Sequence, residues 1–204
     1  MTHDTENTTR TPYIDKMELI VHHTKLPHTE LSDKLDAFIR RIGELVSWVW
    51  LPLVLVIVGN VVMRYLFDQG RVEFEEIQWH LYSLGFLIGL SYCYQADDHV
   101  RVDVLHDRMS LKWQTWIEFI GIVFFLLPFI AIVLIYSVPF VYDSFIISEV
   151  SDAPGGLPFR WAIKSVLFFS FILLCIAALS RLLRCTAFLF GLPKPMKATD
   201  SEEV

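Results

Sequence analysis

Four apolar stretches dominate this 204-residue chain, and each is about long enough to cross a lipid bilayer. A hydrocarbon core of about 30 Å is spanned by about 20 apolar residues in a helix. Helices are expected rather than strands, because an isolated strand in lipid leaves backbone N–H and C=O groups without partners. The sequence therefore predicts an all-α integral membrane protein with four spans, at residues 45–63, 77–95, 117–138 and 161–180.

The second of these spans is the least apolar. Gln78, His80, Ser83, Ser91 and Gln95 interrupt it. Polar side chains are costly against lipid, so this helix is expected to pack against protein on at least one side. The composition fits a membrane protein, since 54% of the residues are hydrophobic and the 20% that are charged lie mostly outside the spans.

Positive charge is distributed unevenly between the two ends of the spans. If the N-terminus is cytoplasmic, 13 of the 17 Lys and Arg residues lie on the cytoplasmic side, and the remainder are Arg64, Arg71, Arg160 and Lys164. Lys and Arg accumulate in cytoplasmic segments, so both termini are predicted to be cytoplasmic. The basic inner rim suits anionic lipid headgroups, and no nucleic-acid partner is expected.

The chain is expected to form one membrane domain, residues 31–192, between two cytoplasmic tails at 1–30 and 193–204. Just before the first span, apolar residues recur at helical spacing, with charged residues on the opposite side. This pattern predicts an amphipathic helix at the inner membrane surface. The alternative is an early start of the first span. The apolar positions are Leu31, Leu35, Phe38, Ile39 and Ile42, and the charged positions are Asp33, Lys34, Asp36, Arg40 and Arg41.

A similar stripe lies between the second and third spans, and it predicts a second surface helix. Its members are Val102, Leu105, Met109, Trp113 and Trp116. Trp is enriched at the headgroup level, so Trp113 and Trp116 are expected to anchor this helix there. Arg40, Arg41, Arg181 and Arg184 are expected to anchor the same rim.

Two prolines bear on the third span. Pro128 is expected to bend it unless neighbouring groups satisfy the freed carbonyl. The residues that follow Pro139 are expected to prolong the span before a turn rich in Pro and Gly.

One face of the second span predicts helix association. Gly85 and Gly89 form a small-xxx-small pair, and Gln78, Tyr82 and Tyr92 project along nearly the same stripe. Small residues allow close backbone approach, and polar side chains beside them form hydrogen bonds between helices. A partner helix at this face is a hypothesis, because such glycine pairs are also common by chance.

At the outer rim, Asn60 and Arg64 end the first span while Glu75 and Glu76 open the second. An ion pair from Arg64 to Glu75 or Glu76 would join the two helices. The alternative is that each residue marks a solvated helix end.

A polar five-residue motif, His99-Val100-Arg101-Val102-Asp103, follows the second span. His99, Arg101 and Asp103 suit contact with a partner, an ion or water. Two potential metal ligands at this spacing without a third are insufficient for a metal site, so none is expected. Solvated loop chemistry is the favoured interpretation of the residues alone.

The membrane interior lacks the features of a self-sufficient carrier. Polar solutes are usually moved by broken helices and buried ionisable residues at mid-depth. Here the charged residues near the spans, Arg64, Glu118, Lys164 and Arg181, all lie close to span ends. The sequence therefore predicts no catalytic, substrate-binding or cofactor residues, and indicates a scaffold rather than an enzyme.

Four motifs, in this order relative to the spans, resemble the small membrane subunit (DctQ-type) of tripartite ATP-independent periplasmic, or TRAP, transporters. The resemblance covers about residues 36–183, and the long N-terminal tail departs from it. The motifs are Asn60-Val61-Val62-Met63-Arg64-Tyr65, Glu75-Glu76-Ile77, His99-Val100-Arg101-Val102-Asp103-Val104 and Gly156-Leu157-Pro158.

This resemblance implies a non-catalytic subunit of a bacterial inner-membrane importer. A periplasmic binding protein (DctP-type) would deliver an organic acid-like solute to the membrane subunits. The large subunit (DctM-type) would move the solute with a sodium or proton gradient and would hold the ion site. The small subunit would act as its scaffold.

Two other classes remain open from the sequence. A haem-bearing anchor of a redox complex needs facing histidines within the membrane, whereas only His80 lies inside a predicted span. A stand-alone exporter or membrane enzyme would need a site, and neither a paired nucleophile and base nor a phosphate-binding loop is visible.

Overall fold

The computed structural model describes residues 26–68, 70–99 and 109–193. Every regular element in these ranges is helical, which confirms the all-α prediction. In chain order the elements are α2 (Glu30–Ser47), α3 (Trp50–Leu66), α4 (Val72–Ala96), α6 (Leu111–Gly121), the π-helix η1 (Ile122–Leu126), α7 (Leu127–Ile146) and α8 (Arg160–Phe190).

Three helical stretches in the described ranges are long and apolar enough to cross a membrane: Glu30–Leu66, Leu111–Ile146 and Arg160–Phe190. They contain the first, third and fourth predicted spans. The second predicted span lies within α4, which is 25 residues long but is not among these three stretches. Its polar residues explain the difference, and its crossing of the membrane stays a prediction.

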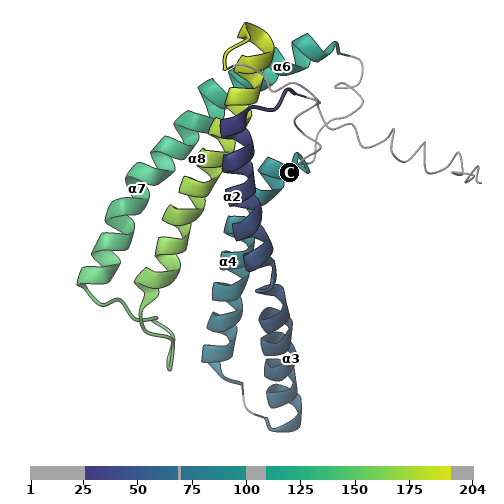
Figure 1. Cartoon of the computed structure of the whole chain (residues 1–204). Helices are drawn as coiled ribbons and strands as arrows, with labels where there is room; N and C mark the ends of the chain where they lie inside the picture. Colours follow the sequence, from purple (N-terminus) through teal and green to yellow (C-terminus); the bar gives the residue numbers. More distant parts are fainter. Residues whose placement is uncertain (1–25, 69, 100–108, 194–204) are drawn as a thin grey trace, which may run out of the picture.

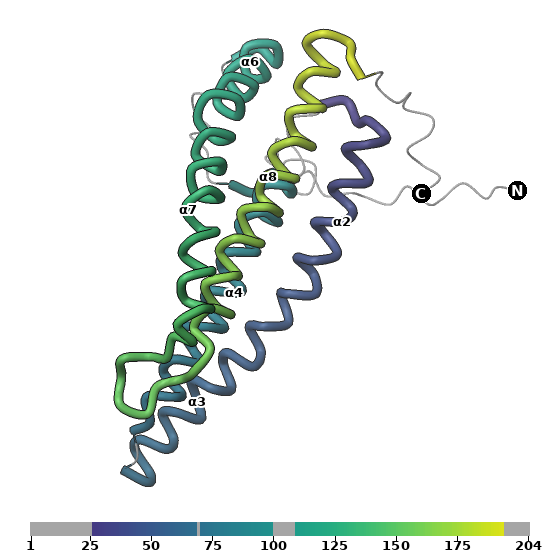
Figure 2. The backbone as a smooth tube through the Cα atoms, turned by 90° about the vertical axis from the view of Figure 1, so that its left-hand side faces the viewer, coloured from purple at the N-terminus to yellow at the C-terminus, as the bar shows by residue number. Residues whose placement is uncertain are grey.

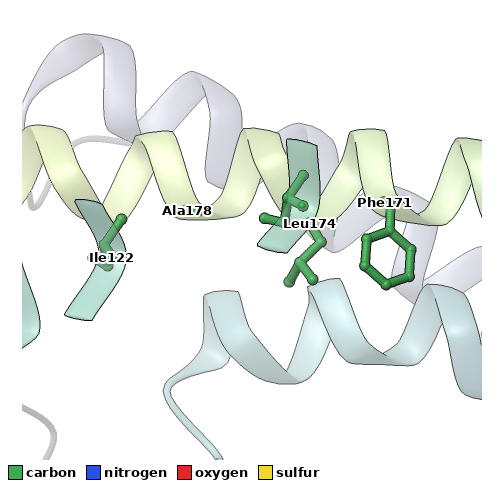
Figure 3. Packing of buried hydrophobic residues seen from close by; sticks show 5 residues of the cluster. Ile122, Phe171, Leu174 and Ala178 are labelled. Atoms are coloured by element: carbon green, nitrogen blue, oxygen red, sulfur yellow. The ribbon is translucent and has the colours of Figure 1, made fainter. Parts of the chain in front are cut away.

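Helix α8 is the central element of the bundle. It packs against α2, α4, α6 and α7, whereas α3 packs against α4 (Figure 1; Figure 2). The start of α2, the end of α8 and α6 lie toward one end, and the loop between α7 and α8 lies at the other. A small apolar core lies between α8 and the third span (Figure 3). Its buried members are Ile122, Ile130, Phe171, Leu174 and Ala178.

The predicted amphipathic helix exists as α2, but it does not lie apart from the bundle. It packs along α8 and α4, and a short turn at Trp48 and Val49 joins it to α3. Pro52 explains this interruption, because it has no N–H to bond to the carbonyl of Trp48. The alternative interpretation, an early start of the first span, therefore describes the backbone better. The position of α2 relative to the lipid surface stays a prediction.

The third span begins earlier than predicted. Trp113 and Trp116 lie on α6, which continues through η1 into α7, so residues from Leu111 onward are not a separate surface helix. The rest of that predicted helix, residues 100–108, lies outside the described residues. The predicted prolongation past Pro139 is confirmed, since α7 ends at Ile146.

The effect of Pro128 is taken up by a π-helical turn. Directly before this proline the backbone changes to π-helical bonding, and the N–H of Leu127 donates to the carbonyl of Ile122. Such turns adjust the hydrogen-bond register where a helix is perturbed. The third span thus stays continuous through the proline.

Two helices leave most of their apolar surface uncovered. Leu53 is the one buried residue of α3, and Ile130 is the one buried apolar residue of α7. Leu55 is 72% exposed and Ile135 is 67% exposed. Surfaces of this size and composition are typical of contact with lipid or with another membrane protein.

Candidate functional site

Among the described residues, the ion pairs that join different elements gather in two groups, one toward each end of α8. The inner cluster, named for the predicted cytoplasmic side and defined as Arg181, Glu118 and Asp97, joins three helices. The Nε and Nη2 atoms of Arg181 donate to Oε1 and Oε2 of Glu118 at 2.6 and 3.2 Å. Nη2 also donates to Oδ2 of Asp97 at 3.1 Å. Arg181 is only 7% exposed, so this guanidinium ties α8 to α6 and to the end of α4 inside the protein.

Asp97 is placed for this bond by the way α4 ends. It follows the last residue of α4 in a left-handed conformation, with φ 64°. Asp accepts this conformation more readily than most residues, because its short side chain bonds locally. The turn therefore directs a carboxylate toward α8.

A second tie joins α2 to α8 beside the inner cluster. Arg184 donates to a carboxylate oxygen of Asp36, and its Nη2 lies 3.5 Å from Oδ1 of Asp33. The hydroxyl of Ser180 donates to Oδ1 of Asp36 at 2.6 Å and to the carbonyl of Ser32 at 3.2 Å. Three helices are thus linked to α8 within one turn of its length.

The buried stripe of α2 is polar in its first half and apolar in its second. Ser32, Asp36, Ile39 and Gly43 are buried at helical spacing. Asp36 was expected among the charged residues opposite the apolar stripe, but it is buried, because α8 supplies Ser180 and Arg184 as its partners. The predicted apolar stripe is divided, because Ile39 is buried while Leu31 and Phe38 are 54% and 49% exposed.

The expected anchoring of the inner rim by arginines is corrected for two of the four residues. Arg181 and Arg184 turn inward onto carboxylates and do not extend toward headgroups. Arg40 and Arg41 are exposed and stay available for that role. Burial of an ion pair makes each partner costly to remove, because the remaining charge is left uncompensated in a medium of low polarity.

The outer end of α4 is fastened to the loop between α7 and α8. Oε2 of Glu76 accepts the N–H of Leu157 at 2.6 Å, and Oε1 accepts the hydroxyl of Ser151. These two hydrogen bonds hold the pKa of Glu76 below its usual range, and the bond from the Leu157 N–H has the larger effect. The Glu75-Glu76-Ile77 and Gly156-Leu157-Pro158 motifs of the sequence thus meet in space.

Glu149 fastens the same loop to the start of α8. Lys164 donates to its carboxylate, and Nε of Arg160 lies 3.8 Å from Oε1. The hydrogen bond from Lys164 holds the pKa of Glu149 below its usual range. Nζ of Lys164 also lies 4.3 Å from the centre of the Phe140 ring. We call Glu76, Glu149, Arg160 and Lys164 the outer cluster.

The spacing of the two clusters matches a membrane. From Lys164 to Arg181, α8 rises by about 26 Å at about 1.5 Å per residue. A hydrocarbon core is about 30 Å thick. No charged residue lies on α8 between these two positions. The distance between the two clusters along α8 is therefore close to the thickness of a hydrocarbon core.

The predicted ion pair at the outer rim is not formed. Arg64 is exposed and has no ion pair within the described ranges. Glu76 bonds to Ser151 and Leu157 instead, and Glu75 is exposed. Asn60 is partly buried on α3.

The predicted association stripe on α4 packs mostly against this chain's own helices. A Cβ on Gly85 would lie 3.1 Å from Cζ2 of Trp50, and Tyr82 meets the Trp50 ring edge-on at 6.1 Å. Tyr92 lies against Gly43 of α2. Nothing lies within 4 Å of a Cβ on Gly89, so that glycine remains open to a partner. The Nε2 atom of Gln78 is buried without a hydrogen-bond partner in the described structure.

Of the polar motif at residues 99–103, the structure describes only His99. Arg101 and Asp103 lie outside the described residues. The His99 ring meets Tyr94 at 6.0 Å, edge-on. Both border an open groove of about 400 Å³ together with Asp97 and Glu118. Among the described residues, no group of His, Cys, Asp or Glu is arranged to hold a metal ion.

Sequence reasoning noted Glu118 and Arg181 at span ends but did not pair them. The pairing could have been suspected from the sequence, because Glu118, Arg181 and Asp97 all lie near the predicted inner ends of their spans. Asp36 gave a weaker signal, since it lies in a helix in which both faces contain charges.

The bundle matches a known family of membrane subunits. No curated protein matches the chain. A family model described as "Tripartite ATP-independent periplasmic transporters, DctQ component" matches residues 53–188. The match covers α3 from Leu53 through most of α8, including both charged clusters. Because it spans more than half of the sequence, the chain belongs to the DctQ family of small membrane subunits of TRAP transporters.

Proposed function

We propose that this chain holds the large, DctM-type subunit of a TRAP transporter in place within a bacterial inner membrane. The proposal rests on a contrast between two parts of the bundle. Ion pairs hold the helices together at the two ends of α8, whereas the apolar surfaces of α3 and α7 are exposed. Ion pairs tie α8 to α2, α4 and α6 at the inner end, while the outer loop is tied to α4 and α8. Helices fixed at both ends form a rigid wall.

The middle of the third and fourth spans supplies no charged side chain for a solute. No Asp, Glu, Lys or Arg occurs in residues 119–142, which run from the end of α6 through η1 into α7, or in residues 165–180 of α8. A carboxylate solute or a coupling cation would need such groups or an opened helix. Transport chemistry is therefore assigned to the large subunit, including the sodium or proton site, and this chain needs no cofactor.

The exposed surfaces of α3 and α7 supply area for the large subunit and for lipid. Contacts in lipid arise from close packing and hydrogen bonds, because the apolar surface is already solvated by lipid tails. Gly89 is an open small residue on α4, because nothing lies within 4 Å of a Cβ placed there. This position suits a closely packed helix of the large subunit.

The remaining parts of the proposal follow from the family and from the charge distribution. A DctP-type binding protein delivers an organic acid-like solute at the outer face. Both termini are cytoplasmic, because thirteen of the seventeen Lys and Arg residues then lie inside.

Co-purification tests the scaffold assignment. An untagged large subunit is expressed with tagged chain, and we expect it to be retained through size-exclusion chromatography. The matched variants are G89L and G59L, because a Cβ at either glycine meets nothing within 4 Å. G89L should release the large subunit while G59L should not. Failure of the unaltered chain to retain the large subunit would refute the assignment.

A further inference from the structure

A groove on α6 combines an apolar floor with one positive charge. It has a volume of about 420 Å³ and is lined by Lys112, Trp113, Trp116 and Ile120. Lys112, Trp116 and Ile120 recur every fourth residue, so they lie along one side of the helix. The groove is thus a strip that runs along α6 from a cation to an aliphatic side chain.

One wall of the groove is fixed by aromatic packing. The Trp116 ring meets Phe119 edge-on at 5.9 Å and Phe190 at the same distance. Phe190 is the last residue of α8, so Trp116 is held between two helices. Trp113 is 65% exposed and forms the open side. The groove between the fixed Trp116 ring and the exposed Trp113 ring is therefore already formed without a ligand.

The depth of the groove places it at the headgroups. If the inner cluster marks the edge of the hydrocarbon, Lys112 lies about 9 Å beyond Glu118 along α6. The polar layer of a bilayer extends about 5 to 8 Å beyond the hydrocarbon on each side. Because α6 bends away from the axis of α7 (Figure 1), Lys112 lies less than about 9 Å beyond that edge, which leaves its long side chain within reach of the phosphates and Ile120 nearer the acyl chains.

Charge selects the ligand. Lys112 is exposed and has no ion pair within the part of the chain that the structure describes. Tryptophans favour the glycerol and headgroup level, and a lysine at that level attracts anionic lipid. A helix of a partner protein need not place a negative charge beside Lys112, whereas an anionic lipid always does.

We propose that this groove binds one anionic phospholipid. Its phosphate pairs with Lys112, its glycerol region lies between Trp113 and Trp116, and one acyl chain follows Ile120. The inference goes beyond the scaffold role and does not depend on the large subunit.

Lipid retention tests the proposal on the full-length chain. The protein is purified with a mixture of phosphatidylglycerol and phosphatidylcholine, and the bound lipid is quantified by mass spectrometry. We expect selective retention of phosphatidylglycerol, reduced about fivefold in K112Q. K112R should retain it. K34Q is the matched control, because Lys34 is also exposed but pairs with Glu30 on α2. Equal retention of both lipids, or an unchanged K112Q with an unchanged melting temperature, would overturn the proposal.

Fluorescence quenching locates the lipid and distinguishes the other occupants. Brominated phosphatidylglycerol should quench the unaltered chain more than brominated phosphatidylcholine does, and W113F should lose most of this excess. Equal quenching by the two lipids would indicate an unselective apolar contact and contradict the proposal. Quenching that disappears when the large subunit is added would assign the groove to that subunit. That outcome also contradicts the proposal, but it leaves the scaffold role intact.

Discussion

Arg181 on α8 and Glu118 on α6 form a two-point hydrogen bond, with N···O distances of 2.6 and 3.2 Å, in the interior of the bundle. Asp97 completes the cluster from the end of α4. A planar guanidinium matches a carboxylate at two atoms, which fixes the orientation of both side chains. The relative positions of three helices therefore depend on one arginine.

Removal of that arginine should loosen the bundle. R181Q is expected to lower the free energy of unfolding by about 3 to 5 kcal/mol, because Glu118 and Asp97 remain as buried carboxylates. R181K should cost less, since one ammonium retains the charge but loses the two-point geometry. Thermal unfolding in detergent, followed by circular dichroism, measures both. R41Q is the control at an exposed position, and a melting temperature for R181Q equal to that of R41Q would contradict the role of the cluster.

The tie between α2 and α8 should depend on Asp36. D36N keeps the shape of the side chain but removes the charge that faces Arg184, so α2 is expected to detach more often. Amide hydrogen exchange across residues 30–47 should accelerate, while exchange within α7 should not change. E44Q serves as the comparison, because Glu44 is exposed on the same helix. Equal protection of α2 in D36N and the unaltered chain would show that the tie is unnecessary.

Two glycines should respond oppositely to an added methyl group. A Cβ on Gly43 would lie 2.4 Å from Cδ2 and 2.9 Å from Cβ of Tyr92, and the latter atom cannot swing away. G43A is therefore expected to destabilise the isolated chain by about 1 to 3 kcal/mol. G89A meets nothing within 4 Å and should be neutral or slightly stabilising. Unfolding midpoints of the two variants provide the comparison, and an unaffected G43A would exclude close packing of α2 on α4.

The attachment of the outer loop should weaken in acid. The pKa values of Glu76 and Glu149 lie below the ordinary value of 4.5, so the folded state favours their charged forms. Their contribution to stability is complete above pH about 4.5 and is lost as the pH falls through the lowered values. Limited proteolysis within residues 147–159 should therefore be constant between pH 5 and 7 and should increase below pH 4. E76Q should show the increased cleavage already at pH 7, whereas E75Q should not.

The helices of this chain were predictable because lipid imposes a long apolar pattern. Residues 117–138 and 161–180 were located from that pattern alone, and α7 and α8 contain most of both. The extensions of these spans, in α6 and in the last turns of α8, were not located. Their Trp, Lys and Arg residues also suit a helix at the membrane surface. The turn at Trp48 and Val49 lies where the amphipathic helix was expected to meet the first span, but Pro52 was not identified in advance as its cause.

Pairing between helices was less predictable than the helices themselves. Glu76 was expected to bond to Arg64 at the same rim, yet the loop offers a backbone N–H and a hydroxyl much closer to it. Asp36 was expected on the charged side of its helix, because nothing in that helix shows that Ser180 and Arg184 lie opposite. Such pairs depend on rotation and register between helices, which a single sequence does not specify.

We propose that this chain supports transport by the large subunit and does not itself move the solute. The most direct measurement is solute uptake into vesicles that contain the large subunit and the matching binding protein, with and without this chain. The account predicts that uptake requires the chain, and that vesicles containing the chain and the binding protein alone take up nothing. Undiminished uptake without the chain, or uptake by the chain without the large subunit, would contradict it.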